Sequence, residues 1–75
     1  MCNTALNNNE NDAIIYFYKG IILSKKGKNS LAIENFTKSI KMSPNASGAY
    51  FNRGQCFFKD KMFKSALEDF NYSFK

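Results

Sequence analysis

The sequence predicts an all-α fold of four helices, arranged as two tandem antiparallel helical hairpins of an α-solenoid. The main observation is an internal repeat with a period of 34 residues. Laying residues 11–41 over residues 45–75 gives ten identities in 31 aligned pairs, without a gap. The second observation is that apolar residues recur at helical spacing within each copy. Repeats of this size stack as supersecondary units, and such units present binding surfaces and seldom carry catalytic chemistry.

The chain divides into a leader and two repeat units. Residues 1–10 show no apolar periodicity and are rich in asparagine, so we expect a disordered, asparagine-rich leader there. The first unit is expected over residues 11–44 and the second, which is truncated, over residues 45–75. Each unit holds two helices, and the four helices are expected at about residues 13–26, 30–42, 47–59 and 62–75.

Helix-breaking and capping residues set the expected boundaries between these helices. Gly27 is expected to end the first helix, because glycine adopts the left-handed conformation of a helix end without strain. Asn29 or Ser30 is expected to cap the second helix with a side-chain oxygen. Pro44 cannot continue the second helix, and Asn45 is the expected cap of the third.

Small residues are expected to bring the two helices of each hairpin close together. Gly20 and Ala32 have little or no side chain, so helices that meet at these residues can approach closely. Phe36 and Tyr16 are expected to fill the space beside the contact. The equivalent residues of the second unit, each 34 positions later, are Gly54, Ala66, Phe70 and Tyr50. A bulky residue at either glycine is therefore expected to push its hairpin apart.

The repeated motif resembles the tetratricopeptide repeat. The first copy is Tyr16-x-x-Lys19-Gly20-x-x-Leu23, then Ala32-x-x-x-Phe36, then Pro44; the second is Tyr50-x-x-Arg53-Gly54-x-x-Phe57, then Ala66-x-x-x-Phe70. The resemblance covers about residues 11–75. Lys19 and Arg53 stand where this family often has leucine, and we expect both at a solvent-facing edge.

The resemblance also implies a binding site. In this family the first helix of each hairpin lines a concave groove that holds an extended peptide or a helix of a partner protein. By position, the groove residues are Phe17, Tyr18, Ile21 and Lys25 from the first unit and Phe51, Asn52, Gln55, Phe58 and Lys59 from the second, with Ile14, Ser24 and Gly48 beside them. An aromatic lining with a basic edge suits an apolar side chain next to a carboxylate.

Two alternatives to this groove stay open at the level of sequence. Phe17 and Phe51 are also expected if aromatic side chains simply pack between repeats. Lys25 and Lys59 lie in the last turns of their helices, where a cation offsets the helix dipole without any ligand.

The residue types needed for catalysis or metal binding are scarce, so we expect no enzyme activity, no cofactor and no metal site. The chain has no histidine and no glycine-rich phosphate loop. Cys2 and Cys56 lack a metal-like spacing, and Cys56 is expected to be a packing residue. Sparse cysteine and the lack of a signal-peptide pattern favour a reduced, cytoplasmic compartment. No apolar run is long enough to predict a membrane span.

The net charge of +5 favours acidic partners. An AT-rich genome would produce the same lysines and asparagines, and that explanation also stays open. The leading hypothesis is a protein-interaction module or scaffold that presents its groove to a peptide or helix of another protein. The alternative is an RNA-binding helical repeat, in which aromatic side chains stack on bases and lysines contact phosphates; nucleic acid is the less favoured partner. A third hypothesis is a fragment of a longer array that associates with itself.

Overall fold

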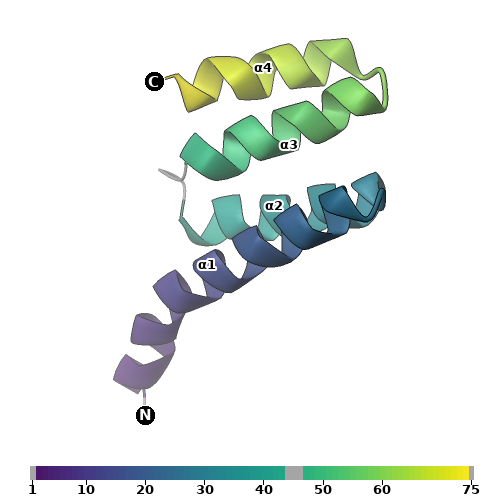
Figure 1. Ribbon diagram of the computed structural model, residues 1–75. Helices are drawn as coiled ribbons and strands as arrows, with labels where there is room; N and C mark the ends of the chain where they lie inside the picture. The colour runs from purple at the N-terminus through teal and green to yellow at the C-terminus, as the bar shows by residue number, and fades with distance from the viewer. Residues whose placement is uncertain (1, 44–46, 75) are drawn as a thin grey trace.

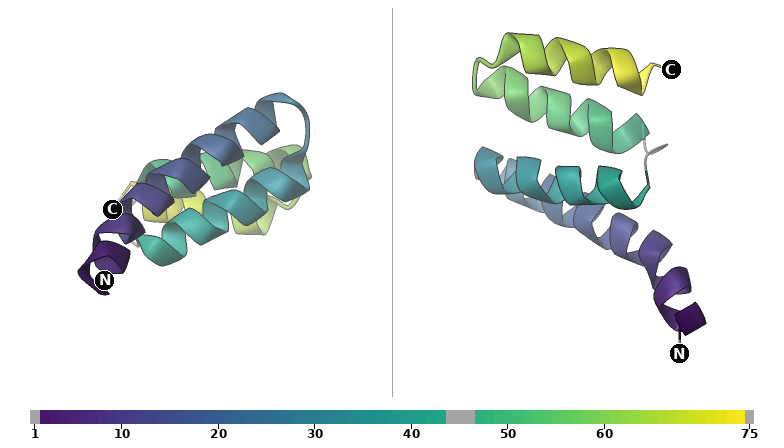
Figure 2. Two further views of the ribbon diagram at one scale, coloured as in Figure 1. Left: turned by 90° about the horizontal axis from the view of Figure 1, so that it is seen from below. Right: turned by 180° about the vertical axis from the view of Figure 1, so that it is seen from behind.

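The computed structural model describes residues 2–43 and 47–74, with the backbone alone for residues 2–11. Within these ranges the chain forms four helices and no strand, which confirms the predicted all-α fold. The helices are α1 (Cys2–Lys25), α2 (Asn29–Met42), α3 (Ser47–Lys59) and α4 (Phe63–Ser73). They stack in chain order, with the α1–α2 and α3–α4 turns on the same side of the stack (Figure 1). Seen from below, α1 and α2 lie side by side and antiparallel (Figure 2). The expected helix break at Pro44 and cap at Asn45 lie outside the described residues.

The first helix is longer than the sequence predicts. Its backbone is helical from Cys2, whereas the helix was expected from about residue 13. Proline and glycine are absent between residues 2 and 19, so no helix-breaking residue stops the helix from extending toward the N-terminus. The helix includes residues 2–10 of the expected leader, and the division of the chain into a leader and two units stays a prediction.

The turn between α1 and α2 depends on Gly27. Its φ of +82° is a left-handed conformation that glycine adopts without strain, which confirms Gly27 as the residue that ends the helix. Lys28 occupies the N-cap position of α2 and makes no side-chain capping bond, so the expected cap by Asn29 or Ser30 is wrong. Asn29 instead donates a hydrogen bond from Nδ2 to Oδ1 of Asp60 at 3.1 Å, which links the turns of the two hairpins.

Replacing Gly27 with alanine is expected to lower the free energy of unfolding by about 1–2 kcal/mol, the cost of a left-handed conformation for a residue with a Cβ. Apart from Gly27 itself and its two chain neighbours, nothing lies within 4 Å of a Cβ built at this position, so the loss comes from the backbone alone. Lys61, at the equivalent position of the α3–α4 turn, has a φ of +65° and already bears this strain. Urea unfolding followed by circular dichroism measures the change. Lys61→Ala is the control and is expected to have little effect; equal losses in the two variants would contradict the argument.

The two helices of each hairpin approach closely because glycine lies opposite phenylalanine. A Cβ built on Gly20 would lie 2.6 Å from Cε1 of Phe36, and one built on Gly54 would lie 2.8 Å from Cε1 of Phe70. Atoms this close repel strongly, so only glycine fits at these two positions without a shift of the ring. The predicted close approach at Gly20 and Gly54 is confirmed.

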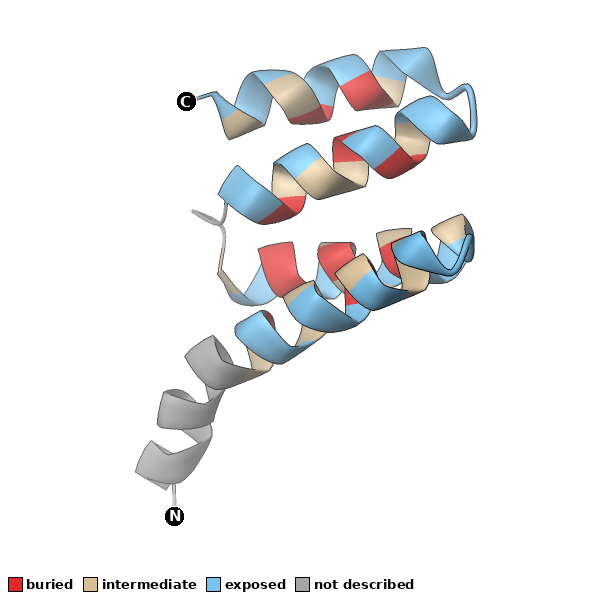
Figure 3. Ribbon diagram, in the orientation of Figure 1, coloured by how far each residue is buried: buried red, intermediate tan, exposed pale blue. Residues whose placement is uncertain are grey.

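The core lies mainly between the two hairpins. Ala32, Phe36 and Cys56 are fully buried and form one cluster. The half-buried residues that pack against this cluster are Phe17, Ile21, Leu23 and Ile33. Buried residues gather where α2 faces α3 and on the inner side of α4, whereas much of the outward side of α4 is exposed (Figure 3). Cys56 is a free, buried cysteine that packs in this core, as the sequence predicts.

Candidate peptide-binding groove

All nine predicted groove residues lie on α1 and α3, the first helices of the two hairpins, which run in the same direction (Figure 1). The structure does not gather these residues into one pocket. Two hollows take up parts of the set, one at the start of α3 and one at its end. We name them the N-terminal hollow and the C-terminal hollow.

The N-terminal hollow has a volume of about 340 Å³ and is lined by Ala13, Ile14, Phe17, Ser39, Ser43, Gly48 and Ala49. Phe17 is one of the nine predicted groove residues, and Ile14 and Gly48 were expected beside them. Buried Ser39 donates a hydrogen bond from Oγ to the carbonyl oxygen of Ala13 at 2.8 Å and so joins α2 to α1 at this hollow. The residues that the sequence analysis missed are Ala13, Ser39, Ser43 and Ala49.

Phe17 forms a wall of the N-terminal hollow and also packs against its neighbours. Its ring centroid lies 6.0 Å from that of Phe36 and 5.4 Å from that of Tyr18. A Cβ built on Gly48 would lie 3.4 Å from Cζ of Phe17, so the edge of the ring reaches α3. Phe17 therefore packs between the repeats, as one of the open alternatives proposed, and still exposes part of its ring to the hollow.

The C-terminal hollow has a volume of about 450 Å³ and is lined by Gln55, Phe58, Lys59 and Phe70. The first three of these residues were predicted from the sequence. The ring centroid of Phe58, an exposed residue, lies 5.2 Å from that of Phe63. Phe51 is close to this hollow, because its ring centroid lies 5.7 Å from that of Phe70.

The other predicted residues have different surroundings. Ile21 packs against the buried core cluster, whereas Tyr18 and Lys25 are exposed on α1. Asn52 is half-buried and donates a hydrogen bond from Nδ2 to the carbonyl oxygen of Gly48 at 2.8 Å, one turn back along α3. The nine residues thus follow two parallel helices as a strip, and their role as a groove stays a prediction.

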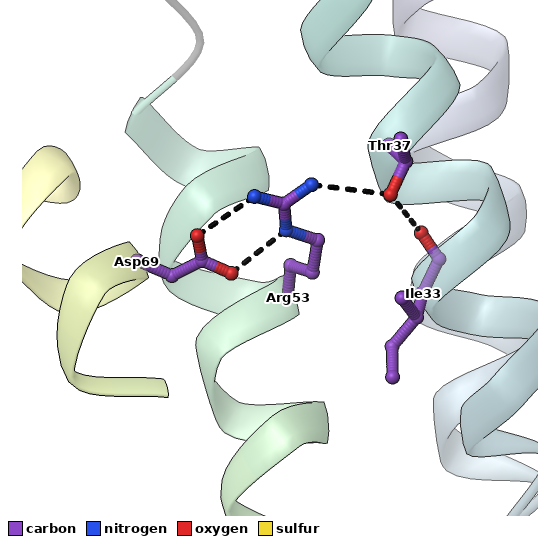
Figure 4. Close-up of polar contacts among 4 residues, drawn as sticks. All are labelled: Ile33, Thr37, Arg53 and Asp69. Atoms are coloured by element: carbon purple, nitrogen blue, oxygen red, sulfur yellow. Dashed lines mark hydrogen bonds and ion pairs between the residues drawn. The ribbon is translucent and has the colours of Figure 1, made fainter. Parts of the chain in front are cut away.

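An ion pair that the sequence analysis missed joins three helices in the second half of the chain (Figure 4). Arg53 on α3 donates from Nε and Nη2 to the two carboxylate oxygens of Asp69 on α4, at 2.7 and 2.8 Å. From Nη1 it donates to Oγ1 of Thr37 on α2 at 3.1 Å. The same Oγ1 donates to the carbonyl oxygen of Ile33 at 2.7 Å. The guanidinium group therefore ties α3 to both of its neighbours.

The surroundings of Arg53 explain why its charge is tolerated away from water. The side chains of Arg53 and Asp69 are only 18% and 4% exposed, and the rings of Tyr50 and Phe57 lie 5.6 Å from the guanidinium carbon. The hydrogen bonds to Asp69 raise the pKa of Arg53 above its ordinary value, although burial opposes them. The expectation that Arg53 lies at a solvent-facing edge is therefore wrong, while its equivalent Lys19 is exposed as predicted.

Comparison with known proteins agrees with this arrangement of hairpins. Residues 13–46, a segment one repeat period long, match the family model described as "Tetratricopeptide repeat". DnaJ homolog subfamily C member 7 from Homo sapiens and from Mus musculus are each 31% identical to the chain over 64 residues. This chain belongs to the tetratricopeptide repeat family. The similarity covers 85% of the chain but only 13% of each of these relatives.

The tetratricopeptide repeat is a non-catalytic class of repeat, and in general it serves as a protein–protein interaction module. In the part of the chain that the structure describes, no three histidine, cysteine, aspartate or glutamate residues are grouped so that they could hold a metal ion. In the same ranges, no helix combines the length and apolar character needed to cross a membrane.

Proposed function

We propose that this tetratricopeptide repeat chain binds an extended, acidic segment of another protein along α3, with the end of α1 beside it. The observation that carries the proposal is that the two hollows lie at opposite ends of one face of α3. Gly48 lines the first hollow, and Gln55 and Phe58 line the second. These positions are separated by seven and ten residues, which is close to two and three turns of a helix.

The spacing of the hollows indicates the length of the segment. Ten residues of α-helix span about 15 Å, and an extended chain covers that distance with about five residues. A segment of this length can place an apolar side chain in each hollow. Phe51 and Asn52 lie between the hollows in sequence and on the same face of α3, so they are positioned to contact the segment between its two anchors.

The charges favour a carboxylate at one end of the segment. Lys25 and Lys59 are exposed in the last turns of α1 and α3, and because the two helices run in the same direction, both cations lie toward the same end of the strip. Lys59 also lines the C-terminal hollow beside Phe58. An apolar residue followed by Asp or Glu matches this pairing of ring and cation.

Binding to synthetic peptides tests the proposal; each peptide carries two apolar residues about five positions apart, followed by acidic residues. The Lys25→Ser/Lys59→Ser variant is expected to weaken binding by more than about tenfold, because it removes the cations that face the carboxylates. Lys41→Ser/Lys64→Ser is the matched control, since it removes the same charge from exposed positions on α2 and α4. The control is expected to bind like the wild type, and circular dichroism checks that all three proteins are equally helical.

Single-stranded RNA is the second probe in this experiment. An RNA-binding surface would lose affinity to a similar extent in both double variants, and its affinity would fall steeply with salt concentration. That result, or peptide binding that does not distinguish the two variants, would contradict the proposed groove.

A further inference from the structure

The interface between the two hairpins shows what fits against a hairpin of this chain. Cys56 of α3 is fully buried against the first hairpin, where it clusters with Ala32 and Phe36. Ile33 packs against the same cluster, and Sγ of Cys56 lies 3.6 Å from Oγ of Ser24, to which it donates. We call this set of residues the Cys56 seat.

The second hairpin carries an open copy of this seat. A hollow of about 360 Å³, here named the end hollow, is lined by Phe58, Phe63, Ala66, Leu67 and Phe70. Subtracting 34 from each number gives positions 24, 29, 32, 33 and 36, which include the four residues of the Cys56 seat that surround Cys56. The end hollow of the second hairpin is therefore lined by the same repeat positions that α3 covers, or that lie beside this contact, in the first hairpin.

Residues in or beside the Cys56 seat are also less exposed than the equivalent residues in or beside the end hollow. Ile40 on α2 is 9% exposed, whereas its equivalent Phe74, just after α4, is 80% exposed. Leu67 is also exposed, although its equivalent Ile33 is half-buried. Much of the outward side of α4 is exposed, while the inner side of α2 is buried against α3 (Figure 3). The second hairpin therefore presents an exposed apolar face at positions that are equivalent to those covered by α3 in the first hairpin.

The matching helix is at the other end of the same chain. On α3, Ala49 and Cys56 are both 0% exposed. Their equivalents on α1 are Ile15 and Ile22, which are 50% and 54% exposed. These two isoleucines are seven residues apart and share one face of α1. They are larger than the residues they replace, and the end hollow supplies the space for a larger side chain.

We propose that a second copy of this chain packs its α1 onto the second hairpin of the first copy, head to tail, with Ile22 of the second copy in the end hollow. The 34-residue register then places Lys19 of the second copy opposite Asn71, as Arg53 lies opposite Thr37 within the chain. An amide oxygen accepts from an ammonium group, and this pairing opposes no two like charges. Because the contact uses a different face on each copy, a pair of chains keeps one free face of each kind, and further copies extend the stack.

Three matched variants test this arrangement, each replacing one exposed apolar residue with lysine: Ile22→Lys on α1, Leu67→Lys at the end hollow, and Leu31→Lys on the solvent face of α2 as the control. Sedimentation equilibrium over a roughly hundredfold range of concentration measures association. The wild type and the control are expected to gain mass with concentration. The other two variants are expected to weaken association by more than about tenfold while keeping wild-type helicity, because each places a charge at the contact.

Mixing the two deficient variants decides the geometry. The Ile22→Lys protein keeps an intact end hollow, and the Leu67→Lys protein keeps an intact Ile22. An equimolar mixture is therefore expected to form a complex of two chains that grows no further. A wild type that stays monomeric at every concentration overturns the proposal. So does an Ile22→Lys protein that associates like the wild type, which indicates pairing of two end hollows, and so does a mixture that forms no complex.

Discussion

Replacing Gly20 with alanine is expected to lower the free energy of unfolding by about 2 kcal/mol. The added Cβ would lie 2.6, 2.7 and 2.9 Å from three ring carbons of Phe36. Phe36 is fully buried between the helices, so the ring has no free space into which to move. Overpacking of this kind costs up to about 3 kcal/mol, and the higher helix propensity of alanine offsets only about 1 kcal/mol.

The equivalent substitution in the second hairpin is the control. A Cβ on Gly54 would lie 2.8 Å from the ring of Phe70 and 3.2 Å from the carbonyl oxygen of Ala66. Phe70 is only half-buried and lines the C-terminal hollow, so its ring is free to move outward. Gly54→Ala is therefore expected to change stability by less than about 1 kcal/mol. Urea unfolding followed by circular dichroism compares the two variants, and equal losses would show that the burial of the phenylalanine does not control the cost.

The equivalence of Gly20 and Gly54 shows why so much of the fold was predictable from the sequence. A 34-residue period fixes which residues are equivalent, and the rule that glycine lies opposite phenylalanine then applies once in each hairpin. Both the close helix contact and the order of the four helices follow from residues near one another in the chain. The bounds of α3, Ser47–Lys59, agree with the prediction for the same reason.

Two kinds of feature were not predictable in this way: a helix boundary that no capping or breaking residue marks, and a hollow that forms only where several helices meet. No residue marks the start of α1, so its extension to Cys2 is visible only in the structure. The N-terminal hollow is formed where α1, the end of α2 and the start of α3 meet. Several of its lining residues are alanine, glycine and serine, whose small side chains leave the space open but give no distinctive pattern in the sequence.

A symmetric repeat gives no sign of the ion pair between Arg53 and Asp69. Lys19 is exposed, and Arg53 was assigned the same surroundings because it stands 34 residues later. The second unit, however, has Asp69 where the first has Asn35, so it alone combines an arginine with a carboxylate at these two positions. The simultaneous change from lysine to arginine and from asparagine to aspartate was the feature of the sequence that could have indicated the ion pair. Its meaning depends on α3 and α4 lying side by side, which places residues 53 and 69 in contact.

Replacing Asp69 with alanine is expected to lower the free energy of unfolding by about 3 kcal/mol. The substitution leaves the charge of Arg53 largely buried without its carboxylate, and breaking one side of a buried ion pair costs about 3–5 kcal/mol. The lower end applies because the side chain of Arg53 keeps some contact with water and its bond to Thr37. A chain of this size has about 3–5 kcal/mol of stability in total, so the variant is expected to keep at most about 2 kcal/mol and to be only marginally folded.

A stabilising osmolyte such as trimethylamine oxide makes the loss measurable, because it refolds such variants and allows the free energy to be extrapolated. Asn35→Ala, at the equivalent position of the first unit, is the control. It removes only a hydrogen bond to the carbonyl oxygen of Leu31 and is expected to cost less than about 1.5 kcal/mol.

The double variant Arg53→Leu/Asp69→Leu separates the two possible origins of the loss. It removes both charges and puts apolar side chains in their place, so it is expected to recover most of the stability that Asp69→Ala loses. Recovery would mean that the cost of Asp69→Ala comes from the unpaired charge of Arg53. A double variant that is as unstable as Asp69→Ala would contradict this. The hydrogen bonds from Arg53 to Asp69 and Thr37 would then be what holds α4 and α2 against α3.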